Sequence, residues 1–267
     1  MLNKKAVSNS VILAGMTVLG ILFLCPDLQA LHLSPNYQVF TLAPGATGTG
    51  AVVVANDEGR PVMIKAYSKD WFVLNENKAE KATDWLVINV PKVKLKKGES
   101  KSIPFLLRAS TNAIGELVGM VSVESVSSEA SSIHQILSVA IYLGIQGTEQ
   151  LKGDLVSFYV EPSSASHSVK AGVAVKNNGN VHLRPTGTVV VSDSSKKNVF
   201  LNIFLQQARP TYPGQIGTYS GQVYNFDLQP GDYIASITMT DIDRRNQFLA
   251  SESALRVSPE GKVELIK

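Results

Sequence analysis

The strongest constraint on the fold is an alternation of apolar and polar residues with a period of two, which recurs along most of the chain after residue 30. It is clearest in segments 169–176 and 233–240. In the first segment one face is formed by Val169, Ala171, Val173 and Val175, and in the second by Tyr233, Ala235, Ile237 and Met239. Because successive side chains of a strand point to opposite faces, this pattern predicts half-buried β-strands.

Similar short runs occur elsewhere, separated by Pro, Gly, Asn and Ser turns. They cover residues 37–42, 50–56, 61–71, 85–90, 102–108, 117–126, 136–145 and 154–160. Strands at this spacing, without long helical patterns between them, indicate antiparallel sandwiches rather than a parallel sheet covered by helices. We therefore predict an all-β protein with two immunoglobulin-like antiparallel β-sandwich domains.

The division between the domains is expected where the alternation stops. The stretch GTEQLKG, residues 147–153, interrupts the apolar pattern and is followed by a new strand candidate. The chain beyond Ala30 is long enough for two domains of about one hundred residues, each with its own core. We predict a first domain over 31–148, a second over 149–258 and a C-terminal tail over 259–267.

Two internal patterns support related domains. VANDEGRP (54–61) and VKNNGNVHLRP (175–185) both end a strand with Asn, turn through Gly and restart after Arg-Pro. LQPGDY (228–233) is typical of the corner before a sandwich strand, where a tyrosine hydroxyl bonds back to the backbone. IGEL (114–117) is the candidate for the same place in the first domain, with leucine instead of tyrosine.

The N-terminus has the order of a secretory signal peptide. Lys4 and Lys5 precede an apolar run over 11–25, and Ala30 is a small residue at the expected cleavage site. We predict removal of residues 1–30, which gives an exported protein of the periplasm or cell surface without membrane insertion. An uncleaved anchor is the alternative, because Leu28 is bulky for its position.

Composition and spacing argue against several classes of function. Cys25 is the sole cysteine, so the mature chain must be stabilised by burial and not by disulfides. The formal charge of +3 falls to +2 without Lys4, Lys5 and Asp27, and no basic run suggests a nucleic-acid partner. No metal site or cofactor is predicted, because the histidines are scattered: His32, His134, His167 and His182.

The apparent catalytic motifs have structural interpretations. PGATGTGAVVV (44–54) lacks the lysine of a phosphate loop and runs into a strand. GTYSG (217–221) lacks the spacing of a nucleophile elbow and is interpreted as a loop. Asp241 and Asp243 are expected to form a solvated strand end facing Arg244 and Arg245, with an acid–base pair as the alternative. We predict that the protein is not an enzyme.

Two further groups of residues could have either a structural role or a role in ligand binding. The segment 175–193 is rich in Asn, Gly and charged residues, and it is interpreted as a turn between two strands. Asp193 with the nearby Asn side chains does not match the spacing of a calcium loop. Trp71, Phe72 and Trp85 are expected in the core, with a ligand groove as the alternative.

Three segments of the first domain suggest a family: DWLVINVPKVKLKKGESKSIPFLLRAS, GELVGMVSVES and SVAIYLGIQG. In this order they resemble the N-terminal domain of periplasmic pilus-assembly chaperones. The resemblance implies two immunoglobulin-like domains set at an angle, and a function in capping pilus subunits by lending them a strand. NNGNVHLRPTGTVVVSD and LQPGDY are also similar to immunoglobulin-like modules of bacterial cell-surface proteins.

The chain departs from the chaperone family in one respect. That family anchors a subunit's terminal carboxylate with an arginine on the first strand and a lysine on the last strand of its first domain. Neither Tyr37–Leu42 nor Ile136–Gly147 contains a basic residue, so the anchor is not carried over to any position.

What does match is an apolar stripe in the strand candidate 136–145, which we expect at an accessible edge of the first domain. Its residues are Leu137, Val139, Ile141, Leu143 and Ile145. Such a stripe can enter a partner's groove while the backbone pairs as an added strand, and the alternative is a core face. The predicted function is chaperone-like binding of an envelope or pilus-subunit-like protein. A structural or adhesive surface module that uses loops at the end of a sandwich is the alternative.

Overall fold

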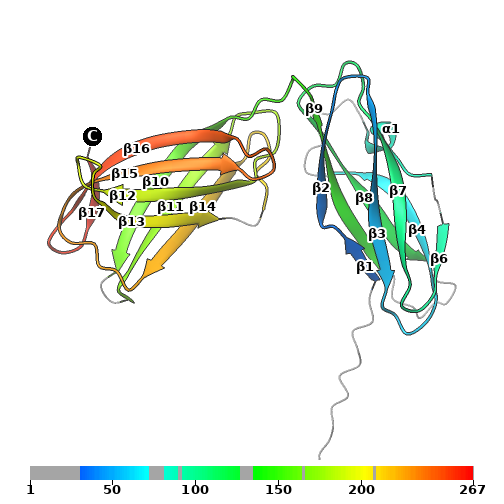
Figure 1. Cartoon of the computed structure of the whole chain (residues 1–267), viewed down its shortest axis with the longest axis horizontal. Coiled ribbons are helices and arrows are strands. Elements are labelled where there is room, and N and C mark those ends of the chain that lie inside the picture. The colour runs from blue at the N-terminus through cyan, green and yellow to red at the C-terminus, as the bar shows by residue number, and fades with distance from the viewer. Residues whose placement is uncertain are drawn as a thin grey trace, which may run out of the picture.

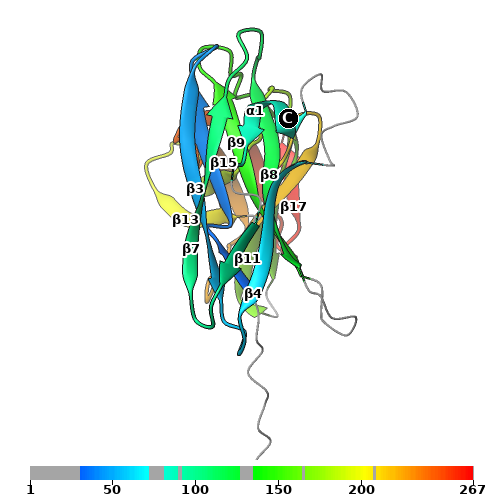
Figure 2. The same ribbon diagram turned by 90° about the vertical axis from the view of Figure 1, so that its right-hand side faces the viewer.

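The chain folds almost entirely into strands, arranged in two parts that are set at an angle to each other (Figures 1 and 2). The computed structural model describes residues 31–71, 81–89, 92–126, 135–163, 166–206 and 209–266. The predicted signal peptide lies outside these residues. The predicted all-β class with two β-sandwich domains is confirmed. Among the described residues, no helix is both long and apolar enough to cross a membrane.

The first part contains two sheets that enclose one core. The four-stranded sheet has the order β1 (Leu31–Ser34), β3 (Thr47–Asn56), β7 (Ser100–Arg108) and β5 (Leu86–Val87). The five-stranded sheet has the order β2 (Tyr37–Leu42), β9 (Ile136–Ile145), β8 (Glu116–Val126), β4 (Val62–Asp70) and β6 (Lys92–Leu95). A single helical turn, α1 (Ala82–Trp85), places the Trp85 indole in the core.

The second part is one continuous sheet of eight strands. Its order is β10 (Gly153–Ser163), β11 (Ser168–Asn177), β14 (Ile216–Tyr224), β13 (Val199–Gln206), β12 (Pro185–Ser192), β15 (Gly231–Asp241), β16 (Gln247–Val257) and β17 (Val263–Ile266). In the described part of the chain, β13 and β14 share only the pair Gln206 and Ser220, and residues from both halves of the sheet pack in one core. The sheet therefore folds into two layers at this point. The boundary between residues 148 and 149 stays a prediction.

Several strands lie where the alternation predicts them, and β2 and β9 have the predicted bounds. The expected strand 85–90 is wrong at its start, because Trp85 closes the α1 turn. β17 forms where only a tail was expected, and it pairs with β16.

The interpretation of GTYSG as a loop is also wrong, because these residues lie inside β14. Their glycines mark close approach of neighbouring groups rather than a turn. A Cβ at Gly221 would overlap the carbonyl oxygen of Phe204, and one at Gly217 would overlap the Tyr219 hydroxyl.

The two patterns that suggested related domains correspond to shared turn geometry. The side-chain amide of Asn56 donates to the carbonyl oxygen of Arg60, four residues on, at 3.0 Å, and that of Asn177 donates to Val181 at 2.8 Å. Each Asn also accepts a hydrogen bond from the backbone N–H two residues on. Both Asn residues are fully buried. The weak sequence echo therefore reports the same hydrogen-bonded turn in both parts.

The predicted tyrosine corner is present in the second part. The Tyr233 hydroxyl donates to the carbonyl oxygen of Gln229 at 2.8 Å. In the first part Leu117 is buried, and leucine has no hydroxyl for this bond.

Candidate functional site

Strand β9 differs along its length in how its backbone is paired. Its antiparallel partner β8 pairs with residues 136–144. Its parallel partner β2 begins only at the pair of Tyr37 with Ala140. Within the described residues, no strand pairs with residues 136–139 on the side away from β8. The free edge is therefore four residues long, and the Ile136 side chain at its start is 50% exposed.

The apolar stripe of β9 lies mostly in the core. Val139, Ile141, Leu143 and Ile145 are at most 1% exposed, and Leu137 is partly buried against the same cluster. The expectation that the whole of 136–145 forms an accessible edge is wrong. After β1 the chain passes into the five-stranded sheet, where β2 pairs with residues 140–145 of β9. The role of the stripe in partner binding stays a prediction, and the open edge is limited to residues 136–139.

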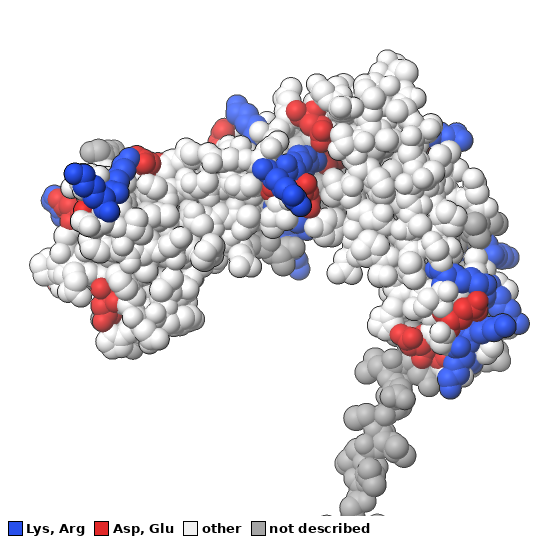
Figure 3. All heavy atoms as spheres, in the orientation of Figure 1, with Lys and Arg blue, Asp and Glu red and all other residues white. Residues whose placement is uncertain are grey.

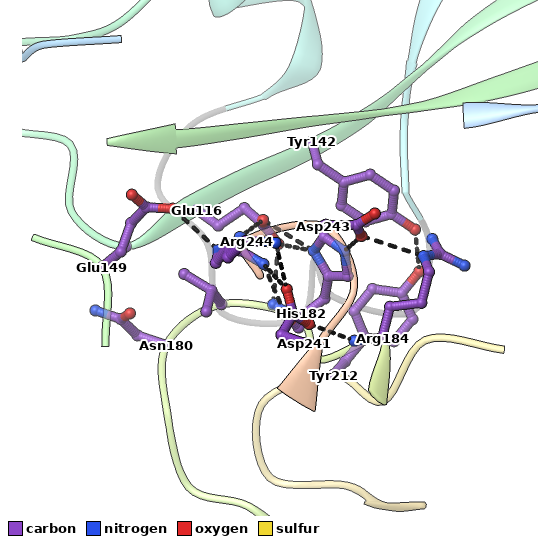
Figure 4. A network of polar contacts seen from close by, with 12 residues as sticks. Glu116, Tyr142, Glu149, Asn180, His182, Arg184, Tyr212, Asp241, Asp243 and Arg244 are labelled. Carbon is purple, nitrogen blue, oxygen red and sulfur yellow. Dashed lines mark hydrogen bonds and ion pairs between the residues drawn. The ribbon is translucent and has the colours of Figure 1, made fainter. Parts of the chain in front are cut away.

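A buried polar network connects the two parts of the molecule (Figure 4). The His182 ring is fully buried between two carboxylates. Its Nδ1 lies 2.8 Å from a carboxylate oxygen of Glu116, at the start of β8, and its Nε2 lies 2.9 Å from Asp243, in the turn after β15. The backbone N–H of His182 donates to Glu116 as well, at 3.1 Å. Glu116 thus receives two hydrogen bonds from one residue of the other part.

Arg244 extends this network to the connecting segment. Its guanidinium donates to Glu116 at 2.6 Å, to the carbonyl oxygen of His182 at 3.1 Å and to Glu149 at 3.2 Å. In Figure 4 it lies between the Glu116 and Glu149 side chains. Asn180 adds a contact to the same segment, because its side-chain oxygen accepts from the backbone N–H of Gln150 at 2.6 Å.

The environment of the network shifts the pKa values of its ionisable groups. Burial alone would raise the pKa of Glu116, but hydrogen bonds and the charges of His182 and Arg244 outweigh it and hold the pKa below its usual range. Burial would lower the pKa of His182, yet its bonds to Asp243 and Glu116 raise it above 6.5. The pKa of Asp243 is lowered despite burial, because His182 and Arg184 contact it. All three shifts favour the charged forms.

Aromatic rings cover one side of the network. The Tyr142 ring of β9 lies 4.0 Å from the His182 ring, and its hydroxyl is 2.9 Å from the Tyr212 hydroxyl. The Arg184 guanidinium lies 4.0 Å from the centre of the Tyr37 ring and 3.2 Å from Asp243. A cation from the second part therefore stands at the start of β2, a strand that has no basic residue of its own.

Two interpretations from the sequence need correction here. Asp241 and Asp243 are not a solvated strand end, because Asp241 is fully buried and Asp243 nearly so. Arg244 faces Asp241, at 3.5 Å, whereas Asp243 is paired with His182 and Arg184, and Arg245 is exposed. The segment 175–193 does form a turn, but it also supplies His182 and Arg184 to the junction. The greater length of this turn could have indicated its second role. Asn177 precedes Pro185 by eight residues, whereas in the related turn of the first part Asn56 precedes Pro61 by five.

The remaining candidates have structural places. Trp85 is buried in the core, as expected. Trp71 packs on Tyr212 at a ring distance of 6.0 Å, close to the junction, and Phe72 lies outside the described residues. Among the residues that the structure describes, no group of three His, Cys, Asp or Glu side chains is arranged to hold a metal ion.

Comparison with known proteins gives likenesses of structure only. No family model and no curated protein sequence matches the chain. Similar solved structures include the class 5 fimbriae chaperone CfaA, with 17% identity, a TM-score of 0.46, and coverage of 84% of this chain and 98% of that one. The SafB chaperone, solved with the SafA pilin of Salmonella enterica, has 12% identity, a TM-score of 0.43, and coverage of 85% and 96%. The periplasmic chaperone SfaE has 13% identity, a TM-score of 0.41, and coverage of 84% and 98%. At these identities and TM-scores, the likenesses assign no role to any residue of this chain.

Proposed function

We propose that this protein is an exported, non-enzymatic, chaperone-like protein that holds an envelope or pilus-subunit-like protein by β-strand pairing. The partner's strand adds to β9 beside residues 136–139. The observation that carries the proposal is the break in pairing at Ala140, which leaves residues 136–139 without a second strand partner among the described residues. The resemblance of the first-domain segments to pilus-assembly chaperones supports the same class of partner.

The chemistry of this edge fits an extended peptide. An unpaired strand presents N–H and C=O groups that a second strand can satisfy, and the side chains of alternate residues add specificity. Ile136 is exposed and apolar, and Ser138 is exposed and small. The open segment holds no charged residue or proline, the usual protections of a strand edge.

The surface of the molecule supports a protein partner rather than a polyanion. On the face shown in Figure 3, charged side chains occur in separate groups; several groups mix positive and negative residues, and others are small and hold one sign. Wide areas between these groups carry no charge. Binding through backbone pairing and apolar side chains does not require a surface patch of uniform charge.

The test places a charge on the open edge. In Ile136→Lys, the lysine remains in solvent, so the melting transition should stay close to that of the wild type. Capture of the envelope partner should fall at least tenfold, because an ammonium replaces the hydrophobe that meets the added strand. Pull-down with the purified partner, together with photo-crosslinking from position 136, measures this loss.

The matched control is Phe204→Lys, an exposed apolar residue of β13 in the second part. It changes charge and hydrophobicity in the same way and should leave capture unchanged. Equal capture by wild type and Ile136→Lys would contradict strand pairing at this edge. Crosslinks confined to sandwich-end loops would instead favour the surface-module alternative.

A further inference from the structure

The junction between the two parts contains an ionisable group whose surroundings demand one protonation state. Both ring nitrogens of His182 face carboxylate oxygens, Nδ1 those of Glu116 and Nε2 that of Asp243. A neutral imidazole carries one N–H donor and one bare nitrogen, so one of these contacts would place a lone pair against a carboxylate. Only the imidazolium donates to both. The geometry therefore requires the charged form, or a proton on one of the acids.

The two carboxylates come from opposite sides of the junction. Glu116 begins β8 in the first part, and Asp243 follows β15 in the second. His182 itself belongs to the turn between β11 and β12. The ring is thus a charged bridge between the two bodies. The Tyr142 ring, tilted by 32° against the imidazole at 4.0 Å, and the burial of the His182 side chain keep water away from it.

The charges around the ring explain what loss of the proton does. Four carboxylates belong to the network: Glu116, Glu149, Asp241 and Asp243. Two permanent cations, Arg184 and Arg244, oppose them. The formal charge of the network is therefore −2 when the His182 imidazole is neutral and −1 when it is protonated. Buried groups of like charge repel strongly, so deprotonation leaves Glu116 and Asp243 less well compensated.

We propose that His182 is a proton-operated clamp that fixes the orientation of the two domains: as an imidazolium it bridges Glu116 and Asp243, and loss of the proton frees the domains to reorient. The clamp is independent of the proposed partner-binding edge. It concerns the angle between the two bodies and not the folding of either one.

The direction of the pH dependence follows from the shifts. The pKa of His182 is raised above 6.5 in the folded protein, so the clamp's contribution is fully present below about 6.5 and is lost as pH rises through the raised value. On the acid side, the pKa values of Glu116 and Asp243 are lowered. Their contribution is therefore lost only when the pH falls below the ordinary range of carboxylic acids.

The experiment follows the proton and the domain orientation in the same samples. Imidazole resonances of the purified protein are recorded by NMR across pH 5 to 10, and residual dipolar couplings and small-angle scattering report the orientation. We expect the His182 resonance to titrate above 6.5, with the couplings of the two domains becoming independent over the same pH interval. His182→Gln identifies the resonance and should give independent domains at every pH.

The control is His167→Gln, which removes an exposed histidine paired with Asp227 at 2.8 Å within the second part. It should reorient over the same pH interval as the wild type. A His182 resonance that titrates at or below 6.5 would overturn the proposal. So would an orientation that stays fixed while the resonance titrates. Both readings come from the wild-type protein, so the test holds even if His182→Gln fails to fold.

Discussion

The two halves of β9 are both mostly apolar, but their surroundings differ. Residues 140–145 are paired on both sides, by β8 and β2, and their side chains are buried. Among the residues that the structure describes, β8 is the one strand that pairs with residues 136–139, and Ile136 is half exposed. The difference shows that a period-two stripe identifies a strand and its inward face but does not identify which backbone edge is open. That property depends on where another segment, β2, begins.

The largest difference between the halves should appear when a charge is placed in each. Ile141→Lys would bury an unpaired ammonium between two sheets, and we expect a loss of several kcal/mol, enough to unfold the first domain. Ile136→Lys should melt near the wild-type temperature. Thermal denaturation followed by circular dichroism compares them. A folded Ile141→Lys protein would show that the closed half can open.

Truncation should give a smaller difference in the same direction. Leu143→Ala removes core contacts and leaves a cavity, at a cost of about 3 kcal/mol. Ile136→Ala should cost under about 1 kcal/mol, because the side chain is half exposed in the native state. Urea titration with domain-specific probes measures both. Equal costs would mean that the start of β9 is covered.

The smallest effect concerns the contact of the closed half with the second part. Tyr142→Phe keeps the ring that lies on His182 and removes the hydrogen bond to the Tyr212 hydroxyl. We expect a loss of about 1 kcal/mol, the net value of a typical hydrogen bond. Tyr212→Phe removes the same hydrogen bond from its other partner and should cost about as much. The two single variants and their double variant should form a non-additive cycle.

The sequence predicts strands well where the period-two alternation of apolar and polar residues is clear. β2 and β9 were predicted with the observed bounds, and the corner bond of Tyr233 was predicted from the residues LQPGDY. β13 was missed because Phe200 and Phe204 stand on its exposed face, beside the buried Leu201 and Ile203, and weaken the contrast in polarity between its two faces. β14 was missed because its glycines imitate a loop.

The junction could not be predicted in the same way. Glu116, His182 and Asp243 are separated by more than sixty residues at each step, and only the folded chain brings them together. A single histidine in an apolar context is usually uninformative. The signal available was the comparison of the two Asn turns, since the second is longer by the three residues His182, Leu183 and Arg184. Two of those three residues contact the network.

The most direct test of the proposed function is amide hydrogen exchange along β9, with and without the purified envelope partner. If a partner strand pairs with the open half, the amides of residues 136–139 that point away from β8 should gain protection. Those of residues 140–145 should be slow in both states, because β2 and β8 already pair with them. Unchanged exchange at 136–139 in a complex that is demonstrably formed would contradict strand addition at this edge.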